Sequence, residues 1–575
     1  METYMDRLSA WRTALAFSSE EERQALEKIA ADPSLAEESF HRFLEFGTAG
    51  MRGTIGLGTN RMNIYMVRRA TQGFAKYLNA AGLAKQGVAI AYDSRLYSDV
   101  FAKEVALILA KNGVKAYLYS TLHSVPQLSY TVLKLHCAGG IVITASHNPP
   151  EYNGYKVYGQ DGGQLASEDA ESVTKYIDGI EDYLSILPMS EEAALEEGLL
   201  VYIGEDIDKL YYQDVLALIQ DKTSLAKQAS SLKVVYTPLF GSGARPVTHL
   251  LNSMGIDLYV VSAQTEPNPA FPGLSAPNPE NKESFILATR LANEVGADLI
   301  LATDPDCDRL GVAVRNDEGD FAILSGNQIG CLLLEYLLRI RRPDFLGGEF
   351  AVRSIASTPM ADKIAAHYGV EMRTVLTGFK YIAEQIKLSL QNGEGRFIFG
   401  FEESYGFLGG TFVRDKDAAM ASVLLTEAAC SYKNQGIGLY TALKHLYETY
   451  GYYAEKVLSL TLSGIHGIEK IGRAVESLRT NMPEQIAGFP VTTVSDFLIN
   501  RKKCITTGEI SPLSLPKTNM LIFDFPDGQV IFRPSGTEPK LKAYLSYVAS
   551  SKAEGDAILK KLFQWAMDEL QSRTE

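Results

Sequence analysis

Paired cysteines, long apolar runs and an excess of positive charge are all missing from this chain. The five cysteines show no CxxC pair, so neither a disulfide framework nor a zinc site is indicated. No stretch approaches the roughly 18 consecutive apolar residues of a membrane span. The net charge of −14 argues against nucleic acid or an anionic membrane as a partner, because its long-range field would repel both.

The first residues also lack the features of a secretory signal. They read METYMD, with early acids and no apolar core. Together with the unpaired cysteines, this absence predicts a cytoplasmic protein.

The pattern of strands and helices predicts an α/β fold. A length of 575 residues suggests about three to five domains. Apolar strands alternate with helical runs three times in series, after a helical stretch of some 40 residues, and the last part is smaller and mixed. We therefore expect domains at residues 1–205, 206–322, 323–455 and 456–575.

A polar loop at residues 144–156 follows an apolar run, residues 139–143, that predicts a buried strand. The loop contains two prolines and a second turn signal at Asn153-Gly154, and Ser146 lies at its front. A lone serine usually just stabilises a turn. Three further loops of similar construction make a chemical role more plausible here.

Three acids, Asp304, Asp306 and Asp308, alternate in the loop after the apolar strand 299–302. Such hard oxygens suit Mg²⁺, and three neighbouring carboxylates repel one another unless a cation neutralises them. The glycine and glutamate of an EF-hand loop are absent. Arg309 follows directly and is a candidate ligand for a phosphate oxygen.

The other two loops suit a phosphorylated polyol. Residues 400–406 carry Glu402 and Ser404 after the strand 396–399, with Arg414 and Lys416 downstream, although a surface turn explains this pattern equally well. The loop 533–542 combines an arginine fork, hydroxyls, an accessible glycine amide and lysines, which is a typical set of phosphate donors. Its candidates are Arg533, Ser535, Gly536, Thr537 and Lys542. A basic surface turn is the alternative for this loop.

Together the four loops indicate phosphoryl transfer to and from a phosphorylated polyol, with the serine as covalent carrier. Ser146 lacks the G-x-S-x-G elbow of serine hydrolases, and no G-x-x-x-x-G-K-[ST] loop is present.

The four motifs, in this order over nearly the whole chain, resemble those of the α-D-phosphohexomutases, the phosphoglucomutase/phosphomannomutase family. The resemblance implies three similar α/β domains with mixed or parallel sheets and a smaller C-terminal α+β domain, around a central cleft. It also implies one Mg²⁺ per chain, held by Ser146, Asp304, Asp306 and Asp308. A sugar 1,6-bisphosphate would be the intermediate and activator.

The resemblance implies further residue roles. Lys156 matches the family's acid/base lysine, and Arg52 matches the arginine of the first active-site loop. A lysine base needs a depressed pKa, which we expect neighbouring cations to provide. Thr377, Gly378 and Lys380 fall in a segment that resembles a loop lining the sugar site.

Three positions depart from the family or weaken a role. Gly406 stands where some bacterial members have histidine, so that residue's role does not carry over. Lys542 stands where relatives often have arginine, which puts bidentate phosphate binding in question. His147 is disfavoured as the base, because adjacent side chains tend to diverge.

The sugar loop Glu402-Glu403-Ser404 resembles the glucose-preferring, bacterial members most. The expected reaction is therefore the interconversion of glucose 1-phosphate and glucose 6-phosphate, by a monomer or homodimer. Mannose or pentose phosphates remain alternatives within the family. A Mg²⁺-dependent phosphatase and a silent sugar-phosphate binding protein are alternatives of other classes.

Overall fold

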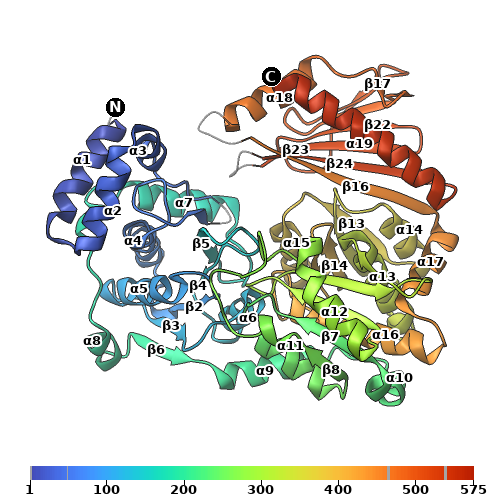
Figure 1. Cartoon of the computed structure of the whole chain (residues 1–575), viewed down its shortest axis with the longest axis horizontal. Coiled ribbons are helices and arrows are strands. Elements are labelled where there is room, and N and C mark those ends of the chain that lie inside the picture. Colours follow the sequence, from blue (N-terminus) through green and yellow to red (C-terminus); the bar gives the residue numbers. More distant parts are fainter. Residues whose placement is uncertain (1–2, 48–49, 463–466, 536–539, 575) are drawn as a thin grey trace. The chain divides into compact units, whose positions relative to one another are not determined.

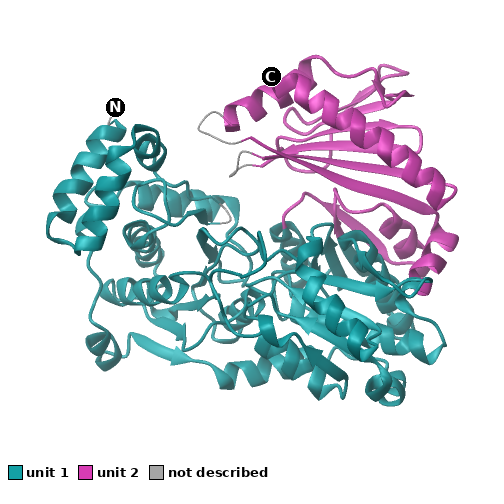
Figure 2. Cartoon of the chain, viewed as in Figure 1, with its two compact units in different colours: residues 1–352, 379–440 teal, residues 353–378, 441–575 magenta. Residues whose placement is uncertain are grey.

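The computed structural model describes residues 3–47, 50–462, 467–535 and 540–574. The chain forms two compact units (Figure 2). Unit 1 comprises residues 1–352 and 379–440, and unit 2 comprises residues 353–378 and 441–575. Among the helices in the described ranges, none combines the length and the apolar character that crossing a membrane requires.

The predicted N-terminal helical stretch is present as α1 (Tyr4–Ala14), α2 (Glu20–Ala31) and α3 (Pro33–Phe40). Side chains of Thr3, Ser19 and Asp32 cap the three helices, as short polar residues do at helix starts. Trp11 is fully buried here, its ring packs edge-on against Phe40 and Tyr65, and its Nε1 donates to the Tyr183 hydroxyl (2.9 Å). These contacts attach the helical stretch to the first α/β segment.

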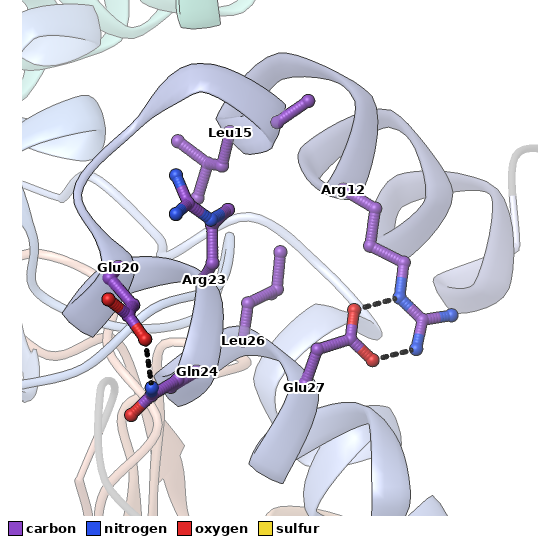
Figure 3. A pocket seen from close by; sticks show the side chains of 8 residues that line it. Arg12, Leu15, Glu20, Arg23, Gln24, Leu26 and Glu27 are labelled. Atoms are coloured by element: carbon purple, nitrogen blue, oxygen red, sulfur yellow. Dashed lines mark hydrogen bonds and ion pairs between the residues drawn. The ribbon is translucent and has the colours of Figure 1, made fainter.

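A hollow of about 430 Å³ lies between α1 and α2 (Figure 3). Leu15 and Leu26 form its apolar part, and Arg12 donates through two nitrogens to Glu27 (2.9 and 2.6 Å). Glu20 accepts from Gln24 (3.0 Å) and Arg23 donates to the Ser18 carbonyl, so the charged groups of the hollow already have partners within the chain.

The first α/β segment contains a six-stranded mixed sheet of order β1-β5-β4-β2-β3-β6 (Figure 1). Its strands are β1 (Met51–Thr54), β2 (Val88–Tyr92), β3 (Ala116–Tyr119), β4 (Gly139–Ile143), β5 (Tyr152–Tyr158) and β6 (Leu200–Ile203). β2, β3, β4 and β6 are parallel, whereas β5 runs antiparallel to both β4 and β1. The helices of this segment are α4 (Ile64–Ala80), α5 (Ser98–Lys111), α6 (Val125–Lys134), α7 (Ser167–Asp178) and α8 (Glu191–Glu196).

The second segment has a five-stranded sheet of order β11-β10-β9-β7-β8. β7 (Lys233–Thr237), β8 (Asp257–Val260) and β9 (Leu299–Thr303) are parallel, and β10 (Leu310–Arg315) and β11 (Phe321–Leu324) continue the sheet antiparallel. Its helices are α9 (Glu205–Leu216), α10 (Lys222–Gln228), α11 (Ala244–Ser253) and α12 (Ile286–Val295).

In the third segment, β12 (Glu349–Ser354), β14 (Arg396–Glu402) and β15 (Gly406–Leu408) lie side by side in that order. They are accompanied by α13 (Gly326–Arg341), α15 (Phe379–Asn392) and α16 (Ala418–Asn434). α16 is buried from Ala418 to Tyr432 and contacts α10, α11 and α13, so it joins the second segment to the third.

Unit 2 is discontinuous in sequence. Residues 353–378 contribute α14 (Met360–Tyr368) and β13 (Glu371–Val375), and the chain re-enters the unit within α17 (Leu439–Tyr450). A seven-stranded antiparallel sheet of order β16-β24-β23-β22-β19-β20-β21 follows. Its strands are β16 (Tyr452–Thr461), β19 (Thr493–Asp496), β20 (Arg501–Cys504), β21 (Ile510–Ser511), β22 (Leu521–Phe525), β23 (Gly528–Pro534) and β24 (Lys540–Ala549). The remaining elements are the pair β17 (Gln485–Ile486) and β18 (Phe489–Pro490), and the helices α18 (Gly467–Thr480) and α19 (Lys552–Thr574).

The fold confirms three α/β segments with mixed sheets and a β-rich C-terminal part, and it corrects two details. Residues 152–156 are not part of a polar loop, because they pair with β1 and β4 as the first half of β5. The predicted turn at Asn153-Gly154 is therefore wrong. The strand expected at 396–399 continues to Glu402, which pairs with Gly406, so Glu402 lies at a strand end.

We predict that Trp11→Ala loosens α1–α3 from the first α/β segment. Truncating a buried tryptophan costs about 3–5 kcal/mol, and here the substitution also removes the hydrogen bond to Tyr183. Hydrogen exchange in α1–α3 should accelerate strongly. Phe17→Ala is the matched control, because Phe17 is 98% exposed and should leave exchange unchanged. Equal exchange in the two variants would contradict the role given to Trp11.

Candidate active site

Ser146 leaves strand β4 in a strained backbone conformation. Its φ of 51° lies in the left-handed region that non-glycine residues seldom adopt. The side chain is 3% exposed, its Oγ donates to Asp304 Oδ2 (2.6 Å), and its amide donates to Thr144 Oγ1 (2.8 Å). The fold therefore brings the predicted nucleophile to the predicted metal loop.

Arg95 holds the serine loop in this shape. One nitrogen, Nη1, donates to the carbonyls of Pro149 (2.9 Å) and Tyr152 (3.0 Å), and Nη2 donates to the carbonyls of Ser146 (2.5 Å) and Asn148. The guanidinium thus donates to four backbone oxygens between Ser146 and the start of β5 at Tyr152.

Asp93 connects Arg95 to the serine. Its Oδ2 lies 3.5 Å from Arg95 Nε and accepts the hydroxyl of Thr144 (2.6 Å), the residue that accepts the Ser146 amide. Burial raises the pKa of Asp93, while Arg95 opposes that shift. Asp93, Arg95 and Thr144 therefore form a buried chain that fixes Ser146 from behind.

The carboxylates of Asp304, Asp306 and Asp308 converge in the tight connection between β9 and β10. One oxygen from each lies within 4.8 Å of the others, and all three side chains are at most 2% exposed. Oδ1 of Asp306 and Oδ1 of Asp308 are buried without a hydrogen-bond partner. Three buried carboxylates with two unsatisfied oxygens fit a hard divalent cation such as Mg²⁺.

Donors from three other segments hold the backbone of this loop. The Pro305 carbonyl accepts from Ser242 through both N and Oγ (2.8 Å each). The Val125 amide at the start of α6 donates to Asp306 O (3.0 Å), and the Ala418 amide at the start of α16 donates to Cys307 O (3.2 Å). The aspartates are thus positioned by groups distant in sequence.

Two lysines offset part of the negative charge. Lys156 Nζ lies 2.7 Å from Asp306 Oδ2 and 3.4 Å from Asp308 Oδ2, and Lys416 Nζ lies 3.1 Å from Asp308 Oδ2. Burial and the neighbouring aspartates raise the pKa of Asp304 well above its usual value. Burial also acts to raise the pKa of Asp308, but Lys416 and Lys156 outweigh it and lower that pKa.

The expected depression of the Lys156 pKa is wrong for this arrangement. Burial and the cations Lys416 and Arg52 lower the pKa of Lys156, but Asp306 and Asp308 outweigh them and raise it. The two carboxylates belong to another segment of the chain, so their approach to Lys156 has no local sequence signal. A divalent cation on those carboxylates would weaken the attraction that keeps the lysine protonated.

The other predicted cations differ in what they contact. Arg52, on β1, lies beside the serine loop, since its Nη1 donates to Asn148 Oδ1 (2.9 Å). Arg309 Nη1 donates to Glu280 Oε1 (2.7 Å), and its Nε lies 3.9 Å from Asp308. Arg414 donates to carbonyls of its own loop, and Lys380 Nζ donates to Ser167 Oγ (3.5 Å). Neither of the last two contacts the aspartates.

The sugar loop is joined to the metal loop through backbone. Tyr405, with φ of 66°, accepts the Leu310 amide at its carbonyl (3.0 Å) and donates its hydroxyl to Leu324 O (3.1 Å). Glu402 is buried and Ser404 half-buried on either side of this turn. A Cβ on Gly406 would lie 2.2 Å from Lys416 Cδ, so glycine at this position leaves room for Lys416.

The remaining predicted residues belong to unit 2. Thr377 and Gly378 end its first segment. Arg533 on β23 lies opposite Lys542 on β24, and the Ser535 amide donates to Lys540 O (2.7 Å). Gly536 and Thr537 lie outside the described residues.

Sequence reasoning missed Asp93, Arg95 and Ser242. Asp93-Ser94-Arg95 directly follows strand β2, at the carboxyl edge where ligands gather in parallel sheets. That position in the sequence could have indicated Asp93 and Arg95 as site residues. The contacts themselves, from Arg95 to residues 146–152, have no local signature.

Comparison with known proteins defines the class. Family profiles described as phosphoglucomutase/phosphomannomutase alpha/beta/alpha domains I, II and III match residues 44–184, 209–319 and 325–450. The chain therefore belongs to the phosphoglucomutase/phosphomannomutase family.

Individual relatives agree with this assignment. A phosphoglucomutase from Staphylococcus epidermidis ATCC 12228 is 39% identical over 511 residues, covering 89% of this chain and 92% of that protein. A phosphoglucomutase from Staphylococcus aureus USA300 is also 39% identical, covering 88% of this chain and 90% of that protein.

Two solved structures share the fold. The phosphoglucomutase parafusin from Paramecium has a TM-score of 0.67 at 17% identity, covering 92% of this chain and 94% of its own. A phosphoglucomutase/phosphomannomutase family protein from Burkholderia thailandensis has a TM-score of 0.64 at 18% identity, covering 92% and 97%.

We predict that Arg95→Lys lowers kcat by about 10²-fold, because a lysine cannot bridge four carbonyls and a misplacement of about 1 Å has effects of this size. Arg315→Lys is the matched control. Arg315 also donates to backbone carbonyls and stacks on Phe321, but it lies at the far end of β10. Equal losses of kcat in the two variants would show that Arg95 acts only through general stability.

We predict that Gly406→Ala lowers kcat at least about tenfold by displacing Lys416 from Asp308. A double-mutant cycle with Lys416→Met checks the route. If the new methyl group acts through Lys416, Gly406→Ala should have little further effect in the Lys416→Met background. Additive losses would contradict this.

Proposed function

We propose that the chain interconverts glucose 1-phosphate and glucose 6-phosphate by way of a phosphoserine at Ser146. The observation that carries the proposal is the placement of the Ser146 hydroxyl, 2.6 Å from Asp304 within the three-carboxylate cluster. A nucleophile adjoining a dense cluster of carboxylates and lysines suits phosphoryl transfer, in which positioning and charge compensation supply most of the catalysis.

In the proposed cycle, the phosphorylated Ser146 gives its phosphoryl group to the free hydroxyl of a glucose monophosphate. The P–Oγ bond breaks as the bond to the sugar oxygen forms, and the sugar hydroxyl loses its proton. The product is glucose 1,6-bisphosphate. After the bisphosphate reorients in the site, Ser146 Oγ attacks its other phosphorus. The bond from that phosphorus to the sugar oxygen breaks, the sugar oxygen takes up a proton, and Ser146 is phosphorylated again.

Lys156 is the proposed proton shuttle, because it reaches the site from β5 and is buried there. Asp304, Asp306, Asp308 and Ser146 would hold one Mg²⁺. When bound, Mg²⁺ offsets the negative charge of the transferring group. Arg52 lies beside the serine loop and is assigned to positioning the phosphoryl group.

We assign binding of the sugar-phosphate substrate to the remaining predicted residues. Glu402 and Ser404 are assigned to hydrogen bonds with sugar hydroxyls, and Arg309 and Lys416, which lie beside Asp308, are assigned to the substrate's phosphate. The phosphate that does not react is assigned to Arg533, Ser535, Gly536, Thr537 and Lys542. Thr377, Gly378, Lys380 and Arg414 complete the proposed substrate contacts. The proposed setting is the cytoplasm, as a monomer or homodimer, without nucleic acid or membrane.

We predict that Ser146→Ala abolishes the mutase reaction, lowering kcat by about 10³-fold or more. Intact-mass measurement should find one phosphate on the parent protein and none on the variant. Full sugar-phosphate phosphatase activity in Ser146→Ala, with no mutase activity in the parent, would instead favour an aspartate nucleophile.

Sugar preference is tested with glucose, mannose, glucosamine and pentose 1-phosphates, with Mg²⁺ and a trace of the matching bisphosphate. We expect glucose 1-phosphate to have the highest kcat/KM. A clearly higher kcat/KM for mannose 1-phosphate would replace the glucose assignment by mannose, and leave the phosphoserine mechanism standing.

A further inference from the structure

Two adjoining hollows lie at the amino end of β14, within unit 1. The larger has a volume of about 350 Å³ and the smaller about 210 Å³. Arg341, Arg396, Leu218 and Phe397 line both. Because β14 runs from Arg396 to Glu402, the hollows lie at the opposite end of this strand from the sugar loop, about 20 Å along it.

Arg341, the last residue of α13, is near the Glu427 carboxylate but makes no hydrogen bond through its guanidinium within the described residues. Its Nε is buried and unsatisfied. Burial lowers the pKa of Arg341, Glu427 opposes the shift, and Arg396 adds to it. One oxygen of Glu427 already accepts the amides of Gln220 and Asp221 (2.6 Å each). Its other oxygen, Oε2, is buried without a hydrogen-bond partner, so Glu427 offsets the charge of Arg341 while both groups keep an unsatisfied buried atom.

Arg396 is only partly compensated. It donates to the Asp344 carbonyl (3.1 Å) and lies 3.4 Å from Glu349 Oε1, with about half of its side chain exposed. Glu349 also accepts the amides of Leu346 (2.8 Å) and Gly347 (3.0 Å). Glu349 therefore compensates Arg396 only in part, and two neighbouring guanidiniums with unused hydrogen-bond donors line the hollows.

The wall beyond the arginines is largely apolar. Ile386 and Leu390 of α15 and Phe412 of the loop before α16 line the larger hollow, with Ser389 and Thr411 as hydroxyls. The smaller hollow contains the Asp344 side chain, which would repel an anion. The room for an uncharged group is therefore in the larger hollow, whose volume lies within the range of small-molecule sites.

We propose that these hollows form a second ligand site, separate from the catalytic one, for an organic phosphate monoester. The phosphate dianion lies between Arg341 and Arg396, because guanidinium forks match phosphate oxygens and each arginine has donors left to give. The apolar part of the ester packs against Ile386, Leu390 and Phe412. A carboxylate supplies only one charge, and inorganic phosphate leaves the apolar wall uncovered.

The test is hydrogen exchange of the full chain with phenyl phosphate as the probe. With phenyl phosphate at about ten times its Kd, we expect hydrogen exchange in residues 385–398 and 408–413 to become slower by up to about tenfold. The full effect applies to amides that exchange only through local openings in which the ligand must first dissociate. Arg341→Met should lose this slowing. Arg342→Met removes the same charge from an exposed neighbour that lines neither hollow, and it should keep the slowing. Binding at the catalytic site is read separately in residues 144–158 and 304–309.

A structural role for Arg341 has a different signature. Because its guanidinium makes no hydrogen bond and is partly desolvated, Arg341→Met without ligand should have an unchanged or higher Tm, and a fall of several degrees would overturn the proposal. So would the absence of slowing in the parent, or its persistence in Arg341→Met. Arg396→Met is the second variant, should the first fail to fold. Equal slowing of exchange by benzoate or phenol would contradict the claim that the ligand is a dianion. Equal slowing by inorganic phosphate would contradict the claim that an apolar group of the ligand contributes to binding.

Discussion

The mutual repulsion of Asp304, Asp306 and Asp308 is the constraint around which unit 1 is organised. Their carboxylates are buried within 4.8 Å of one another, where like charges are expensive. Burial alone would protonate them, as the raised pKa of Asp304 illustrates. Lys156 from β5 and Lys416 from the loop before α16 reach them and offset part of this cost. The two lysines come from different segments, so the site exists only when those segments are docked.

Backbone strain also occurs in the loops of this site. Ser146, Cys307 and Tyr405, one in each of the three loops at the site in unit 1, all have φ between 51° and 66°. Each such residue costs about 1–3 kcal/mol and persists only where its surroundings over-determine it. Here the surroundings are donors to loop carbonyls, namely Arg95 on the serine loop, Ala418 at Cys307 and Leu310 at Tyr405. Loop shape and charge placement therefore depend on the same packing.

Local patterns were sufficient to predict the three α/β segments and the loops that carry Ser146 and the aspartates. Apolar strands followed by polar loops are visible in sequence because burial and exposure alternate over short distances. β5 was missed because Asn153-Gly154 reads as a turn, whereas its pairing with β1 is a long-range property. For the same reason the partners of Arg95 and Lys416, and the discontinuous unit 2, could not be read from the chain. The pKa of Lys156 was predicted in the wrong direction for the same reason, because the carboxylates of Asp306 and Asp308 that raise it come from another segment.

The helix α16 shows how one element connects these requirements. Its buried length packs against α10, α11 and α13, and its first amide donates to the Cys307 carbonyl in the aspartate loop. Asp417 caps the helix at the Met420 amide (2.8 Å) and accepts the Tyr211 hydroxyl, and Lys416 stands directly before it. The cap fixes the helix start, and the helix start fixes the backbone of the lysine. Because the cap, the lysine and the carbonyl contact lie within three consecutive residues, a shift of α16 would disturb the aspartate loop's charge and its geometry together.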